Sequence, residues 1–353
     1  MSTTRDRIRV LVCSLALSAV APHLVSGQSL SFARAGSIAG PVDRVKAQGH
    51  VAYVVANKTL TIYDVSDPAA PKRVGGHTFS EQVWGFRVIG SRIYAATGHS
   101  GLAILDVSNP AAPMPVSQFK TPGQAKNVSV AGTVALVANH MSGVDVVDIS
   151  DSARPKLVGS AYLDGYARDV ATFGSMAVAV DNPSGVYVFD TAKQDPLEPV
   201  TAVQSATSPQ QVEIVELAEG KKLAVLAGNE PYDPLSTLRA RAGEKPRPGS
   251  VQVFDVSNPA SPVLVGSYPT SGNGRRLAVK GPLVYVADGP DGLQVLDVSA
   301  PSKATVVGTY KTDIPARDIA VSDSLVFMVL GPLRTGSAPK DDGDVLILRQ
   351  TSK

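Results

Sequence analysis

Basic side chains gather at one position of a repeated pattern in this chain. Alignment of the repeats on a recurring turn glycine gives that position, in chain order, to Asp43, Trp84, Lys126, Arg168, Gln210, Arg275 and Arg317. The guanidinium group of arginine matches the geometry of carboxylate, phosphate and sulfate groups. A tryptophan ring can stack on a sugar or another flat ligand. The pattern therefore predicts an anion-binding site made by Trp84, Lys126, Arg168, Arg275 and Arg317.

A structural role for the same residues is the alternative. The next repeat position holds Arg44, Gly85, Asn127, Asp169, Gln211, Arg276 and Asp318. Since Ala-Arg-Asp recurs at 167–169 and 316–318, the arginines can instead bond loop carbonyls or carboxylates between neighbouring repeats. Trp84 can likewise fill the space that it points into rather than contact a ligand. The sequence leaves both alternatives open.

Two histidines are the candidates for proton transfer. His99 and His140 fall in equivalent loops of adjacent repeats, on the side where the basic residues are expected. An imidazole titrates near neutral pH and suits general acid or base catalysis. The competing interpretation is that both are ordinary polar loop residues. Neither an HxH nor an HExxH spacing occurs, so the sequence predicts no metal site, and we expect no cofactor.

The repeat that positions these residues has a period of 42. An aspartate recurs at this interval at 64, 106, 148 and 190, and again at 255 and 297 after one interval of 65. Each unit contains four short runs rich in β-branched residues, separated by turn residues. A period of about 40–45 residues with four strands per unit is typical of a β-propeller.

Seven third strands can be counted, so the sequence predicts an all-β, seven-bladed β-propeller. The seventh unit ends without its fourth, outer strand. Residues 33–38 match the outer-strand segments 157–160 and 264–267. The N-terminal strand is therefore predicted to complete the last blade and close the ring. Closure removes the free strand edges that an open array would present.

The aspartate at the end of the third strand occurs in six of the seven units, and we expect it to be structural. Its carboxylate can accept a backbone N–H bond in the turn that follows, and the serine and proline after it shape that turn. A catalytic group is normally needed once, whereas this one returns in blade after blade.

The third-strand sequences LAILD (102–106), VDVVD (144–148) and LQVLD (293–297) resemble the LVIVD repeat. The resemblance covers nearly all of the chain after residue 27. It implies a propeller like those of exported or surface proteins of bacteria and archaea, and it implies no particular activity. The seventh unit lacks the aspartate, and the fourth unit carries Asp190-Thr191-Ala192 in place of the usual Asp-Val-Ser.

Residues 1–27 have the pattern of a secretory signal peptide. Arg5, Arg7 and Arg9 precede an apolar run too short to span a membrane, and small residues favour cleavage after Gly27. We therefore expect a secreted or periplasmic protein whose residues 28–353 form a single propeller domain with no membrane span. Without the leader, 30 basic and 30 acidic residues remain. This neutral balance predicts no nucleic-acid partner.

Two expansions interrupt the regular repeats, at about 230–249 and 332–342. Both fall in the loop between the second and third strands of a blade, which places them on the same face as the basic residues. Extra loop length in a repeat protein often serves binding. An excursion of the chain without function is the alternative.

Two functions compete. The first is an exported, monomeric module that binds a small anionic ligand or another extracytoplasmic protein at the channel mouth. The second is an enzyme, a lyase or hydrolase of an anionic carbohydrate or small carboxylate. Its anion would be held by Arg168, Arg275 and Arg317, with His99 or His140 as acid or base. The neutral overall charge and the lack of a recognisable catalytic motif favour the binding module.

Overall fold

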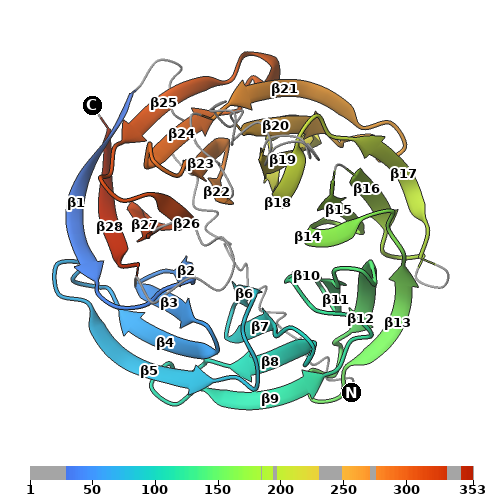
Figure 1. Ribbon diagram of the computed structural model, residues 1–353, viewed down its shortest axis with the longest axis horizontal. Coiled ribbons are helices and arrows are strands. Elements are labelled where there is room, and N and C mark those ends of the chain that lie inside the picture. The colour runs from blue at the N-terminus through green and yellow to red at the C-terminus, as the bar shows by residue number, and fades with distance from the viewer. Residues whose placement is uncertain are drawn as a thin grey trace, which may run out of the picture.

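Short apolar runs separated by turns form the strands of seven four-stranded antiparallel sheets. The computed structural model describes residues 29–183, 185–193, 197–229, 249–270, 276–331 and 343–352. Within these residues the sheets stand around a common axis like the blades of a propeller (Figure 1). The predicted all-β, seven-bladed fold is confirmed.

The strands occupy equivalent places in every blade. The innermost strands are β2 (Arg44–Gln48), β6 (Gly85–Ile89), β10 (Asn127–Ala131), β14 (Tyr166–Phe173), β18 (Ser208–Glu216), β22 (Arg276–Lys280) and β26 (Ala316–Ser322). The second strands are β3 (Val51–Ala56), β7 (Arg92–Ala96), β11 (Val134–Ala138), β15 (Met176–Asn182), β19 (Lys222–Asn229), β23 (Leu283–Ala287) and β27 (Leu325–Leu330).

The third strands are β4 (Thr59–Asp64), β8 (Leu102–Asp106), β12 (Val144–Asp148), β16 (Gly185–Asp190), β20 (Ser250–Asp255), β24 (Leu293–Asp297) and β28 (Val345–Ser352). The outer strands are β5 (Lys72–Thr78), β9 (Met114–Phe119), β13 (Lys156–Ala161), β17 (Pro199–Gln204), β21 (Val263–Pro269), β25 (Thr305–Tyr310) and β1 (Leu30–Ile38). Among the described residues, two 3-10 helices lie between strands, Ala218–Gly220 and Pro301–Lys303. We number the blades one to seven from β2 onward, so β26, β27, β28 and β1 form blade seven.

The N-terminal strand closes the ring as predicted. β1 pairs antiparallel with β28, from Leu30 opposite Ser352 to Ile38 opposite Val345. The strand is longer than the predicted 33–38, and the side chains of Ser31 and Thr351 add a hydrogen bond of 2.7 Å. Figure 1 shows β1 in blue on the outside of the red strands of blade seven.

The hydrophobic core lies between blades rather than inside one of them. Seven buried apolar clusters occur among the described residues, one at each interface between neighbouring blades. At the first interface, Leu60 and Ile62 of blade one pack with Ile93 and Leu105 of blade two. Inner strands buried on both faces read as continuous apolar runs, because no side of them meets water.

We call the face of the ring opposite the N-terminus of β2 the lower face. On this face the same hydrogen bond occurs in six blades. The carboxylate at the end of each third strand accepts a bond from the backbone N–H two residues later, at 2.8–3.0 Å. The six acceptors are Asp64, Asp106, Asp148, Asp190, Asp255 and Asp297. The predicted structural role of the repeated aspartate is therefore confirmed.

A glycine in the outer strand lets the next blade approach closely. A Cβ atom on Gly75 would lie 1.9 Å from the carbonyl oxygen of Pro110, in the turn of the following blade. At the ring closure, a Cβ on Gly36 would lie 1.6 Å from the carbonyl oxygen of Pro68. The glycine of one repeat and the proline turn of the next therefore form one contact of the ring.

Candidate functional site

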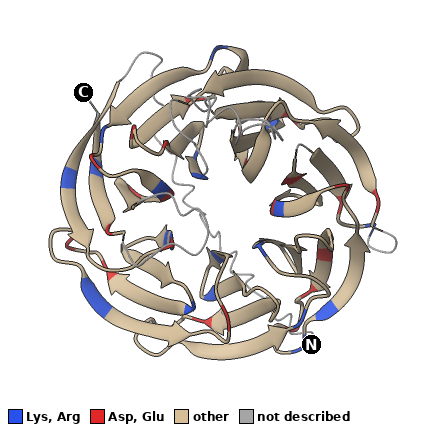
Figure 2. Cartoon of the chain, viewed as in Figure 1, with Lys and Arg blue, Asp and Glu red and all other residues tan. Residues whose placement is uncertain are grey.

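The N-terminal ends of the innermost strands surround a pocket of about 380 Å³. We call it the mouth pocket, and its lining residues are Asp43, Arg44, Gln82, Val83, Trp84, Lys126, Arg168, Gln210, Arg276 and Arg317. Five of them are cationic and one is a carboxylate. Figure 2 shows Lys and Arg positions on several of the innermost strands, which stand around the centre of the ring. A confined, strongly cationic pocket is suited to an anionic group.

The structure brings four of the five predicted binding residues together in this pocket. Trp84, Lys126, Arg168 and Arg317 all line it, whereas Arg275 lies outside the described residues. Two further cations, Arg44 and Arg276, come from the next repeat position, to which the sequence assigned no binding role. Each of them directly follows a residue of the predicted ring in sequence, and this proximity could have identified them as pocket residues.

Lys126 and Trp84 are in direct contact. The Nζ atom of Lys126 lies 3.4 Å from the centre of the indole ring, which is a cation–π arrangement. Burial and the charge of Arg168 lower the pKa of Lys126 to about 8. The ammonium covers one face of the ring, so a ligand that stacks on this face of Trp84 must displace it.

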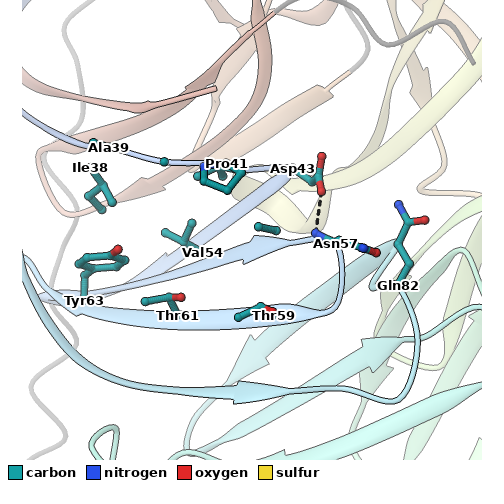
Figure 3. A pocket seen from close by; sticks show the side chains of 13 residues that line it. Ile38, Ala39, Pro41, Asp43, Val54, Asn57, Thr59, Thr61, Tyr63 and Gln82 are labelled. Atoms are coloured by element: carbon teal, nitrogen blue, oxygen red, sulfur yellow. Dashed lines mark hydrogen bonds between the residues drawn. The ribbon is translucent and has the colours of Figure 1, made fainter. Parts of the chain in front are cut away.

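Asp43 and Arg317 join the first and seventh blades at the mouth. Arg317 Nη2 lies 3.3 Å from Asp43 Oδ1, and both side chains are nearly buried. The other carboxylate oxygen of Asp43 accepts a bond of 2.7 Å from the backbone N–H of Asn57 (Figure 3). The Nη1 atom of Arg317 has no hydrogen-bond partner within the described residues. Arg317 therefore joins blade seven to blade one with one nitrogen, while its second terminal nitrogen is buried without a hydrogen-bond partner among the described residues.

Arg44 has the structural role that the alternative interpretation foresaw for the arginines. Its guanidinium donates to the carbonyl oxygens of Trp84, at 3.0 Å, and of Asp43, at 2.8 Å. Burial and the nearby charge of Arg276 lower the pKa of Arg44 to about 10. Arg44 thus fixes the backbone of two residues that line the pocket and also adds positive charge to it.

Carboxylates next to the mouth bind the backbone of the next blade. Asp318 accepts a bond of 2.9 Å from the N–H of Val45, and Asp169 accepts one of 3.0 Å from the N–H of Val212. Gln211 exchanges two bonds of 2.9 Å with the backbone of Leu277. These side chains connect adjacent innermost strands. Burial raises the pKa of Asp169 to about 6, although the charge of Arg87 opposes the shift.

An ion pair crosses the axis below the mouth pocket. Arg87 of β6 and Glu213 of β18 approach to 2.5 Å, although blades two and five are not neighbours. Burial opposes the charge of Arg87, but the carboxylates of Glu213 and Asp169 outweigh it and raise its pKa. Burial likewise opposes the charge of Glu213, and Arg87 and Lys46 outweigh it and lower its pKa. The pair places two charged groups beneath the mouth, three residues along the strand from Trp84.

The two predicted catalytic histidines make different contacts, and neither lines the mouth pocket. His99 is exposed, and its backbone N–H donates to Glu81 at 2.8 Å. The His140 ring stacks on Tyr166 with 4.7 Å between ring centres. Burial, followed by the charges of Lys126 and Arg168, lowers the pKa of His140. Of the two histidines, His140 is thus the one whose pKa is lowered by the cations of the mouth.

The backbone of His140 has a role of its own. It adopts a left-handed φ of 54°, which is also found at the equivalent positions Asn57, Gly98 and Gly289. In each of these four blades the carbonyl of this residue accepts a bond of 2.8–2.9 Å from a backbone N–H at the start of the next blade. Asparagine and glycine adopt this conformation most readily. The loop geometry therefore does not require a histidine here.

The described part of the chain offers neither a cluster of metal ligands nor a membrane-spanning helix. It contains no group of three or more His, Cys, Asp or Glu side chains placed to hold a metal ion. None of its helices has the length and apolar character needed to cross a bilayer. The predicted leader at 1–27 lies outside the described residues, as do the predicted loop expansion at 332–342 and all but the last residue of the expansion at about 230–249.

The seven four-stranded sheets and the repeated sequence place this protein in the class of seven-bladed β-propellers built from sequence repeats. The LVIVD repeat matches residues 39–77, 82–121, 122–162, 249–270 and 271–312, which together are more than half of the chain. The chain belongs to the LVIVD-repeat family. No curated protein matches it.

Solved structures of other propellers share the fold at low sequence identity. The β-propeller domain of Cps50 (Swd1) from Myceliophteria thermophila superposes with a TM-score of 0.66 at 11% identity, covering 90% of this chain and 99% of that one. A chain of the mitotic checkpoint complex gives 0.65 at 12% identity, over 97% and 99%. The computationally designed Ika8 protein gives 0.56 at 8% identity, over 90% and 99%. These likenesses establish the fold alone.

Proposed function

We propose that this propeller is a binding module that recognises an anionic ligand in the mouth pocket. The observation that carries the proposal is the charge of the pocket, where five cations and a single carboxylate line about 380 Å³. Cations confined in this way repel one another, and the lowered pKa of Lys126 records that repulsion together with burial. A carboxylate, phosphate or sulfate group would relieve it.

The arrangement favours binding over catalysis. His140 stacks on Tyr166 and His99 is exposed, and the lining residues of the mouth pocket include neither imidazole. A general acid or base must reach the reacting group within hydrogen-bond distance. The enzyme hypothesis would need His140 to turn into the pocket, and it is therefore the second choice.

Trp84 provides a direct test, because it is the only tryptophan of the chain and lines the pocket. Titration with sulfate, phosphate and citrate should change its fluorescence, since an anion that draws Lys126 off the indole alters the environment of the ring. The variant K126Q/R276Q should bind these anions at least about tenfold more weakly, because two favourable charges are lost. Arg317 is left intact, since its removal would also strand the buried Asp43.

The matched control is K72Q/K156Q, which removes two charges from exposed positions of outer strands. It lowers the net charge by the same amount and should bind as the unaltered protein does. Equal affinities for all three proteins would refute the proposal. A large loss of Tm in K126Q/R276Q with unchanged anion binding would assign these residues to blade packing instead.

We also propose that the protein is exported, on the strength of the basic, apolar and small-residue pattern of residues 1–27. N-terminal sequencing of protein from the extracytoplasmic fraction should give a start close to residue 28. A product that retains residues before 20, or that remains in the cytoplasm, would contradict export.

A further inference from the structure

A second pocket adjoins the mouth on blade one. It measures about 750 Å³ and lies between the segment that follows β1 and the face of β3 and β4. Asp43 and Gln82 line both this pocket and the mouth pocket. In Figure 3 these two residues stand at one end, and Ile38 and Tyr63 stand at the other. We call this pocket the blade-one crevice, and it leads outward from the mouth along the blade.

The crevice differs from the mouth in its chemistry. The hydroxyl groups of Thr59, Thr61 and Tyr63 line it, together with the side-chain amides of Asn57 and Gln82. Among the described lining residues none is basic, and the one carboxylate belongs to Asp43, at the end shared with the mouth. The remaining surface is apolar, with Ile38, Pro41 and Val54. A neutral ligand part that carries both hydroxyl groups and C–H faces fits such a lining.

Blade one combines a short loop with a small side chain. Two residues, at 57 and 58, connect β3 to β4, whereas five residues at 97–101 connect β7 to β8 in blade two. Blade four also has a two-residue connection, at 183–184, but it carries a large side chain nearby. A shorter loop covers less of the space between blades. The position of Thr61 is occupied by Tyr187 in blade four, where the phenol hydroxyl reaches Asp181 and the backbone N–H of Asp164. A large side chain at this position thus occupies the gap in one blade and is missing in blade one.

We infer that the blade-one crevice is a neutral subsite continuous with the mouth, and that the ligand is an acidic saccharide longer than one sugar unit. The inference rests on the proposed function, because it takes the mouth as the place of the acidic group. The hydroxyl groups of a sugar donate and accept hydrogen bonds, as the threonines, the tyrosine and the amides of the crevice also do. Each pocket lies within the range of typical ligand sites, of roughly 300–1,000 Å³.

The two pockets together select for length as well as charge. A lone carboxylate or phosphate group occupies only the mouth. A chain of uronic acid units can place one carboxylate against the cations while the next sugar enters the crevice past Asp43 and Gln82. The second unit adds contacts without the cost of a second association step, so a longer ligand should bind more tightly.

The probes are galacturonate, digalacturonate and trigalacturonate, titrated calorimetrically and by the fluorescence of Trp84. The trisaccharide should bind at least about tenfold more tightly than the monosaccharide. The variant T61Y, which introduces the residue of blade four, should remove this increment and leave the affinity for galacturonate unchanged. The control T61A carries the residue that blade two has at Ala103, keeps the crevice open and should retain most of the increment.

The outcomes separate this inference from the proposed function. Equal affinities for one and three units, or a trisaccharide affinity that T61Y does not change, would overturn the subsite while the anionic mouth stands. The same holds if sulfate or phosphate binds and no uronate does. If no anion binds at all, both proposals are wrong. Should T61Y fail to fold, T59L at an exposed lining position must reduce the increment, and an undiminished increment counts against the subsite.

Discussion

At the lower face six blades repeat the same aspartate and the same hydrogen bond to the backbone two residues later. At the mouth, one aligned position holds aspartate, tryptophan, lysine, arginine and glutamine in different blades. Both places derive from one repeat of 42 residues. Uniformity in six blades marks a part that serves the structure of the blade, and divergence marks the part at which we propose that a ligand binds.

The largest expected effect comes from the contact that joins the outer strand to the next lower turn. G75A places a methyl group 1.9 Å from the carbonyl oxygen of Pro110. Backbone must move to relieve this overlap, so we expect a loss of at least about 3 kcal/mol in the free energy of unfolding. Denaturant titration measures it.

The control is S117A, at the equivalent position of blade two. Ser117 already carries a Cβ, and its hydroxyl donates to the carbonyl of Ser152 at 2.7 Å. The loss of one hydrogen bond should cost about 1 kcal/mol. If G75A and S117A had equal effects, the close approach of glycine and proline would not be a requirement of the ring.

The ion pair below the mouth should come next in size. E213Q leaves the buried Arg87 without its carboxylate partner at 2.5 Å, and we expect a loss of about 2–3 kcal/mol at pH 7. Because the folded protein lowers the pKa of Glu213, the stabilisation is present above the unfolded pKa and is lost as the pH falls through the lower, folded value. The difference between E213Q and the unaltered protein should therefore shrink in acid, and a difference independent of pH would contradict this role.

A smaller effect is expected for one aspartate of the lower face. D297A removes the acceptor of the Ser299 N–H, which lies at 2.9 Å, and should lower the Tm by about 2–4 °C. D297N keeps an acceptor oxygen and should melt close to the unaltered protein. Anion binding monitored through Trp84 should be the same in all three. A change in binding would mean that the two faces are coupled, against the division of roles described above.

The smallest effect is a pH dependence confined to the mouth. Lys126, with a pKa of about 8, is charged at pH 6.5 and largely neutral at pH 9.5. The affinity for sulfate, which does not titrate in this range, should fall a few-fold as the pH rises through 8. K126Q should bind weakly and with little change over the same range. A pH dependence that survives in K126Q would assign the titration to another group.

The sequence predicted the ring well because each blade repeats the same local instructions. The aspartate that recurs every 42 residues identified the blades, and the match of residues 33–38 to other outer strands identified the strand that closes the ring. Alignment also predicted that Trp84, Lys126, Arg168 and Arg317 would lie at one level. A residue at the same position of each repeat lies at the same height along its strand, and this alone predicts which residues surround the mouth.

What the sequence did not predict are contacts between different repeats. The pairing of Arg87 with Glu213 joins blades that are not adjacent, and the pairing of Arg317 with Asp43 joins the last blade to the first. Periodicity carries no information on which side chains meet across the axis. The crevice was missed because it arises where a short loop and a small side chain at Thr61 occur in the same blade.

The strand that closes the ring also sets the order of folding. β1 pairs with β28, and Ser31 meets Thr351 across 320 residues of chain. Six sheets can form from neighbouring segments as synthesis proceeds, but the seventh must wait until β28, at Val345–Ser352, has been made. Contacts this distant in sequence form slowly, because the loop must close before they contribute to stability. Until β1 pairs with it, β28 presents an unpaired strand edge. The chain is therefore most prone to aggregation before the ring closes.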